Sequence, residues 1–185
     1  MSQKVNFLQS PQVLKALEFS AKAHTGQVRK YTNAPYIDHP VGVAEIVSKV
    51  SGATVQMIQA ALLHDVIEDC GVTEEQIKGE FGNMVSMFVW YLTSVKDPDK
   101  KRAVRKAEYR DKLAEAPGMV HTIKLADMLH NFPDIVFHDP KLAKIWIPEQ
   151  ADLWKVLKGG DEKLRFKVQE AITVGAMKLV AKETV

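Results

Sequence analysis

The sequence has one cysteine, no long apolar run and almost no excess of either charge, and each absence excludes a class of protein. Cys70 is the only cysteine and cannot form an internal disulfide, which excludes a disulfide-stapled secreted scaffold. No apolar stretch approaches the ~20 residues needed to cross a bilayer, and Met1–Gln12 lacks the basic-then-apolar order of a secretory signal. We therefore expect a cytoplasmic protein with no membrane partner.

The charge balance also excludes a strongly basic surface. The chain has 25 basic and 23 acidic residues and a formal net charge of +2. Nucleic-acid partners usually require a concentrated basic surface, so we expect none. The segment 100–112 is rich in Lys and Arg, but acidic residues interleave it, which is typical of a solvated helix face.

Internal repeats, low-complexity tracts and long linkers are missing as well. A chain of 185 residues then predicts one domain, spanning residues 1–185. Apolar residues recur at spacings of three and four, which predicts an all-α helical bundle. Helices are expected over about 11–24, 38–50, 54–69, 74–81, 84–95, 100–116, from 119 past 129, 140–157 and 161–182.

The chemistry is concentrated on the predicted helix 54–69. Its segment MIQAALLHDVI is apolar nearly all round, which is typical of a buried helix, yet His64, Asp65, Glu68 and Asp69 follow in quick succession. Burying an unpaired carboxylate costs several kcal/mol. This helix has no Lys or Arg, so a compensating cation must come from elsewhere. The alternative is a core histidine with acids pointing to solvent, but the four residues together favour a divalent metal.

A second acidic position lies in VHTIKLADMLHN, where Asp127 has Asn131 one turn further on the same face. The alternative for Asp127 is an ion pair with Lys124. His39 stands at another helix start, just after Asp38, whose carboxylate can cap that helix. Two imidazoles and two carboxylates form a mixed nitrogen and oxygen set that suits Mn²⁺, Fe²⁺ or Zn²⁺, so we predict one bound divalent cation.

Other candidate groups are assigned no chemistry. His121, His130 and His138 could in principle supply a second metal, but no carboxylates accompany them, so we predict surface or core roles. Cys70 has no partnering base nearby in the sequence, so a nucleophilic role is not expected.

Four motifs carry a resemblance to a known family. HTGQVRKYTNAPYIDHP, AALLHDVIEDCGVT, IKGEFG and KLADMLHN, in this order, closely resemble the hydrolase domain of RelA/SpoT homologues, which belong to the HD phosphohydrolase superfamily and degrade the alarmones ppGpp and pppGpp. The resemblance covers about residues 12–135, and the helices at about 140–182 lie beyond it. It implies a single-domain HD-type helical bundle and, because the chain has no room for a synthetase domain, a freestanding small alarmone hydrolase.

The resemblance also implies a site and a mechanism. The family's metal ligands fall on His39, His64, Asp65 and Asp127. Its acidic pair falls on Glu68 and Asp69, which would position a water whose pKa the metal lowers and would handle its proton. The hydroxide would then attack phosphorus and the 3′-pyrophosphate would leave. Mn²⁺ is the cation that we expect.

A guanine nucleotide is the implied substrate partner, and its predicted contacts are Arg29, Lys30 and Asn131. The guanidinium of Arg29 suits a phosphate or a purine face, and the ammonium of Lys30 suits a phosphate. The chain departs from the family at Met128, where a basic residue is usual, and at Pro133, which would end or kink its helix. These departures leave open an HD phosphatase acting on another nucleotide, such as a nucleoside monophosphate or NADPH, or a non-catalytic nucleotide sensor. No pattern indicates an oligomeric state.

Overall fold

The structure is a computed structural model that describes residues 9–183, with side chains up to residue 181. Residues 1–8, part of the segment in which no secretory signal was found, lie outside the described residues. The described part contains ten α-helices, and its only extended pairing is an isolated bridge between Val28 and Pro35. The predicted all-α class is therefore confirmed. None of the helices in this part is both long and apolar enough to span a membrane.

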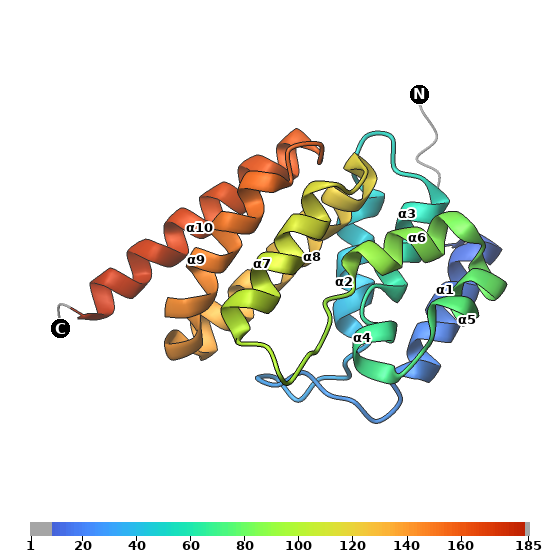
Figure 1. Ribbon diagram of the computed structural model, residues 1–185, viewed down its shortest axis with the longest axis horizontal. Coiled ribbons are helices and arrows are strands. Elements are labelled where there is room, and N and C mark those ends of the chain that lie inside the picture. Colours follow the sequence, from blue (N-terminus) through green and yellow to red (C-terminus); the bar gives the residue numbers. More distant parts are fainter. Residues whose placement is uncertain (1–8, 184–185) are drawn as a thin grey trace. The chain divides into compact units, whose positions relative to one another are not determined.

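Contacts between Cα atoms divide the chain into two compact units, the first ending at Thr93 and the second beginning at Ser94. The single domain over residues 1–185 stays a prediction. The first unit contains α1 (Pro11–Ala23), α2 (Asp38–Ser48), α3 (Val55–Leu63), α4 (Val66–Cys70), α5 (Glu74–Phe81) and α6 (Asn83–Leu92). Helix α3 packs against α1, α2 and α6 (Figure 1), and its residues from Met57 to Leu63 are all buried, so it forms the centre of this unit.

The predicted helix 54–69 is interrupted. Thr54 caps α3, since its hydroxyl accepts from the Met57 N–H at 3.2 Å, but α3 ends at Leu63. His64 and Asp65 separate it from α4, and Asp65 has φ −102° and ψ −7°, outside the usual helical range. The single-helix prediction was wrong because the spacing of apolar side chains continues across the break and so gives no signal of it. Gly71 ends α4 with φ +69°, as predicted.

Two predicted caps had different outcomes. The capping box of α5 is confirmed, with Thr73 and Gln76 joined by reciprocal bonds of 2.8 and 3.2 Å. The Asp38 cap was wrong, because Asp38 is the first residue of α2 and no side chain caps this helix. The first N–H groups of α2 donate instead to loop carbonyls, the Asp38 N–H to Pro35 at 3.2 Å and the His39 N–H to Tyr36 at 2.9 Å.

The second unit contains α7 (Arg102–Ala114), α8 (Gly118–His138), α9 (Pro140–Val156) and α10 (Glu162–Glu183). Helix α10 packs against α8 and α9, and α7 packs against α9 (Figure 1). His121 joins three segments here, because its Nε2 donates to the Leu113 carbonyl at 2.7 Å and its Nδ1 accepts from the Gly159 N–H at 3.1 Å. Surface or core roles were predicted for His121, His130 and His138, and His121 is buried in the core of this unit.

Helix α8 continues through Pro133, so the helix does not end at this residue, while the alternative of a kink stays a prediction. Packing on both sides of the proline supports the helix. Phe132 is buried and packs edge-on against Trp146 with ring centroids 4.7 Å apart, and Val136 lies against Gly175 of α10. Such contacts compensate for the backbone hydrogen bond that proline cannot donate.

Candidate metal centre

His64 lies between α3 and α4 with a side chain that is 4% exposed. Its Nδ1 is 2.8 Å from the carbonyl oxygen of Ala61. A carbonyl can only accept, so Nδ1 carries the hydrogen and the lone pair of a neutral ring is on Nε2. Metal-binding histidines are commonly fixed in this way, with the second ring nitrogen bonded to a backbone carbonyl.

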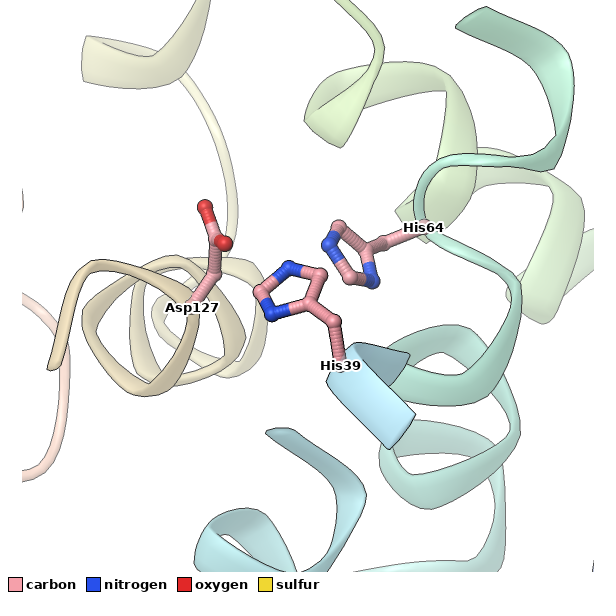
Figure 2. A group of neighbouring side chains, drawn as sticks. All are labelled: His39, His64 and Asp127. Carbon is pink, nitrogen blue, oxygen red and sulfur yellow. The ribbon is translucent and has the colours of Figure 1, made fainter. Parts of the chain in front are cut away.

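Two imidazoles converge on one carboxylate oxygen in the first unit. The Nε2 atoms of His64 and His39 lie 3.1 and 3.7 Å from Oδ2 of Asp65, and the two ring centroids are 5.1 Å apart. Figure 2 shows these rings directed toward one another from separate segments. At this distance the lone pair of His64 Nε2 and the Asp65 carboxylate repel each other unless a metal cation or a proton on Nε2 lies between them. The donor set therefore fits a divalent metal.

The loop before α2 positions His39 and carries two of the predicted substrate residues. Its backbone folds back on itself, since the Tyr36 N–H donates to Gln27 at 3.0 Å and the Arg29 N–H to Ala34 at 2.8 Å. Lys30 is exposed beside this turn, while Arg29 is half-buried with its guanidinium carbon 6.0 Å from the Tyr36 ring centroid. Their contacts with substrate stay a prediction.

The predicted acidic pair lies on α4, directly after the metal-type residues. Glu68 is half-buried and Asp69 is exposed. The hydroxyl of Tyr36 donates to Asp65 Oδ2 at 2.7 Å and lies 3.4 Å from Asp69 Oδ2. Gln27 adds a second link, because its amide donates to the Asp69 carbonyl at 3.2 Å. The loop before α2 is thus connected to Asp65 and to Asp69.

Cys70 has a histidine beside it in space that is distant in the sequence, and the expectation that Cys70 has no nucleophilic role stays a prediction. Its Sγ lies 3.2 Å from Nδ1 of His24, a residue at the end of α1. The same Nδ1 lies 2.8 Å from the Gln27 side-chain oxygen, and the His24 ring stacks on Tyr36 at 4.6 Å. The contact was missed because these residues are distant in sequence and belong to no common periodic pattern.

In the second unit, Asp127 projects from α8 as a buried carboxylate, 6% exposed (Figure 2). Both oxygens accept hydrogen bonds, one from Lys124 Nζ at 2.7 Å and the other from Asn131 Nδ2 at 2.7 Å. The ion pair considered as an alternative therefore exists. The ion pair holds the carboxylate in a fixed orientation, which a metal ligand also requires.

Asp127 also borders a pocket of about 360 Å³ within the second unit, a volume within the range of small-molecule sites. Lys124 and Asn131 line it, together with the aromatic rings of Tyr109 and Trp146. Two of its lining acids, Glu149 and Asp152, form ion pairs with basic residues outside the lining. The two-pronged hydrogen bond from Arg102 to Glu149, with both contacts at 2.8 Å, raises the pKa of Arg102, and a hydrogen bond from Lys155 lowers the pKa of Asp152.

The helical fold and the imidazole–carboxylate cluster together define a helical protein with a candidate metal centre. A family model described as HD domain matches residues 16–158, which is most of the chain. The chain belongs to the HD-domain family.

Within this family, the chain is similar to proteins that are named for one particular reaction. The chain is 38% identical over 128 residues to a Danio rerio protein named guanosine-3′,5′-bis(diphosphate) 3′-pyrophosphohydrolase MESH1, covering 66% of this chain and 68% of the relative. The Mus musculus protein of the same name is 36% identical over 129 residues, covering 69% and 71%. A solved structure described as a metazoan orthologue of SpoT that hydrolyses ppGpp has a TM-score of 0.79 and 27% identity, covering 88% of this chain and 94% of that one. The resemblance to RelA/SpoT homologues is confirmed.

Proposed function

We propose that this chain is a metal-dependent hydrolase that removes the 3′-pyrophosphate of guanosine alarmones, converting ppGpp and pppGpp to GDP and GTP. The observation that carries the proposal is the convergence of two imidazole Nε2 atoms on Asp65 Oδ2, with the tautomer of His64 fixed by a backbone carbonyl. The choice of substrate is supported by relatives at 36% and 38% identity that are named for this reaction.

One divalent cation is the proposed cofactor. Its proposed ligands are His39, His64, Asp65 and Asp127. This mixed nitrogen and oxygen set suits Mn²⁺, which is the cation that we propose. When bound, such a cation supplies Lewis acidity, which lowers the pKa of a water ligand and polarises a phosphoryl oxygen. The assignment of Asp127 is supported by its burial and by the two donors that orient it.

Glu68 and Asp69 are the proposed catalytic acids, which position the attacking water and accept its proton. Both follow Asp65 on α4, and neither is fully buried, so solvent reaches them. The water oxygen forms a bond to the 3′-linked phosphorus while the bond from that phosphorus to O3′ breaks. The 3′-oxygen takes up a proton, and pyrophosphate leaves intact.

Three residues are the proposed substrate contacts. Arg29 and Lys30 lie on the loop before α2, where a guanidinium and an ammonium can bind phosphate oxygens, and the guanidinium can also stack on guanine. Asn131 donates one amide hydrogen to Asp127 at 2.7 Å and lines the pocket of the second unit. We propose that the Asn131 side chain contacts the nucleotide there.

Two other functions remain as alternatives to test. A nucleoside monophosphate or NADPH could be the substrate of the same metal site, and a sensor could bind the nucleotide without turnover. The full set of ligand-type residues with both acids favours catalysis. We expect the protein to act in the cytoplasm, without a nucleic-acid or membrane partner.

The test is product analysis of the purified full chain with Mn²⁺ and ppGpp. We expect GDP and intact pyrophosphate in equal amounts, with loss of activity in EDTA and recovery when Mn²⁺ is restored. Release of orthophosphate from AMP or GMP at a higher kcat/KM than pyrophosphate from ppGpp would refute the alarmone assignment. Tight binding of ppGpp without any product would favour the sensor.

A further inference from the structure

The phenol of Tyr36 contacts the candidate centre at several points. Its hydroxyl donates to Asp65 Oδ2 at 2.7 Å and lies 3.4 Å from Asp69 Oδ2. Its backbone carbonyl accepts from the His39 N–H at 2.9 Å. One residue therefore touches two proposed metal ligands and one proposed catalytic acid, and it belongs to neither set.

Tyr36 is itself held from two sides. Its ring stacks on the buried His24 ring, with centroids 4.6 Å apart and planes 30° apart. Its backbone N–H donates to Gln27 at 3.0 Å, which closes the loop. The position of the hydroxyl is thus determined by the fold before any ligand binds.

The hydroxyl of Tyr36 makes a contact that the ring alone cannot make. A phenylalanine would fill the same space and keep the stack on His24, but it would leave Asp65 Oδ2 without a donor at 2.7 Å. A hydroxyl has one hydrogen, and the shorter contact takes it. The contact with Asp69 at 3.4 Å is therefore weaker.

We propose that Tyr36 is a positioning residue, whose hydroxyl fixes the orientation of the Asp65 carboxylate for the cation and keeps Asp69 next to it. Its kinetic consequence rests on the proposed function. Hydrogen-bond partners of metal ligands fix the orientation and basicity of those ligands, and removing one typically costs about 10–100-fold in metal affinity or activity. Tyr36 acts through Asp65 and Asp69 and makes no contact with the reacting atoms.

The test compares Tyr36→Phe with Tyr91→Phe, which removes a hydroxyl from α6 in the same unit. Titration calorimetry with Mn²⁺ alone, on the full chain without nucleotide, should give an affinity about 10–100-fold weaker for Tyr36→Phe and unchanged for Tyr91→Phe. At saturating Mn²⁺, kcat for ppGpp should fall by a factor in the same range while KM stays at the wild-type value. In EDTA, Tyr91→Phe should melt at the wild-type temperature and Tyr36→Phe somewhat below it, because Tyr36→Phe keeps its ring but loses a hydrogen bond to a carboxylate.

A third variant separates the hydroxyl from the ring. Tyr36→Leu also removes the ring that lies beside Arg29, so KM for ppGpp should rise in this variant and not in Tyr36→Phe. If Tyr36→Phe binds Mn²⁺ as tightly as the wild type, the positioning role is overturned. The Mn²⁺ titration does not depend on the substrate, so a wild-type chain that leaves ppGpp intact would overturn the proposed function alone.

Discussion

Replacing Asp127 with asparagine preserves the shape of a buried side chain and removes the charge that faces Lys124. The two side chains are 8% and 17% exposed, so solvent screens their interaction little. A hydrogen bond to a charged group contributes about 1.5–3 kcal/mol, and we expect Asp127→Asn to lose an amount in this range in EDTA. For a chain of 185 residues this lowers the melting temperature by roughly 3–12 °C.

Besides this loss of stability in EDTA, Asp127→Asn should reduce the stabilisation that a bound metal provides. A cation at a hundred times its dissociation constant stabilises the protein that binds it by about 2.7 kcal/mol, or roughly 5–11 °C at this chain length. We expect Mn²⁺ to raise the melting temperature of the wild type by this amount and that of Asp127→Asn much less. Thermal denaturation followed by circular dichroism, with Mn²⁺ or with EDTA, measures both parts.

Lys124→Met is the matched control. It breaks the same ion pair, whose atoms are 2.7 Å apart, but it keeps the proposed ligand. Its melting temperature in EDTA should fall, while its increase with Mn²⁺ should be at least as large as in the wild type, because no ammonium then competes for the carboxylate. If Asp127→Asn shows the full increase with Mn²⁺, then Asp127 is not a ligand, and its burial serves the ion pair alone.

Three further predictions concern catalysis, substrate binding and packing. Glu68→Gln and Asp69→Asn should each lower kcat for ppGpp by about 10²–10⁴-fold with Mn²⁺ affinity nearly unchanged, and a wild-type rate in steady-state assays would rule out the assigned role. Arg29→Ala should raise KM for ppGpp more than it lowers kcat, and an unchanged KM would exclude the contact. Gly160→Ala should cost about 1–3 kcal/mol in chemical denaturation, because its Cβ would lie 2.5 Å from Leu125 Cδ1; a variant as stable as the wild type would show that this packing yields easily.

The fold class could be predicted because helical spacing of apolar residues survives in a single sequence. Local signals also worked where the physics is local, as in the capping box of α5 and the left-handed Gly71. Local signals were insufficient where tertiary contacts decide. Pro133 stays within α8 because packing on both sides compensates for a missing hydrogen bond, and no local pattern contains that packing.

The candidate site could be predicted in part. His64 and Asp65 stand out because polar residues in an apolar segment require a partner, and the structure brings them together with His39. Tyr36 and His24 were missed. Tyrosine and histidine in or beside a loop are ordinary in composition, and loops carry no periodicity from which a contact across the fold could be inferred.

The turn that precedes α2 also determines where this chain can change in length. Between Tyr36 and His39 the backbone forms a tight turn closed by the bond from the His39 N–H to the Tyr36 carbonyl, so an inserted residue there would shift an imidazole away from Asp65. The tip beyond the bridge of Val28 and Pro35 is different, since Asn33 has φ +56° and is exposed. Exposed loop tips of this kind tolerate insertions well. A short tag or a dye inserted beside Asn33 would therefore provide a probe next to Arg29 and Lys30, the proposed substrate contacts, without lengthening the turn that holds His39.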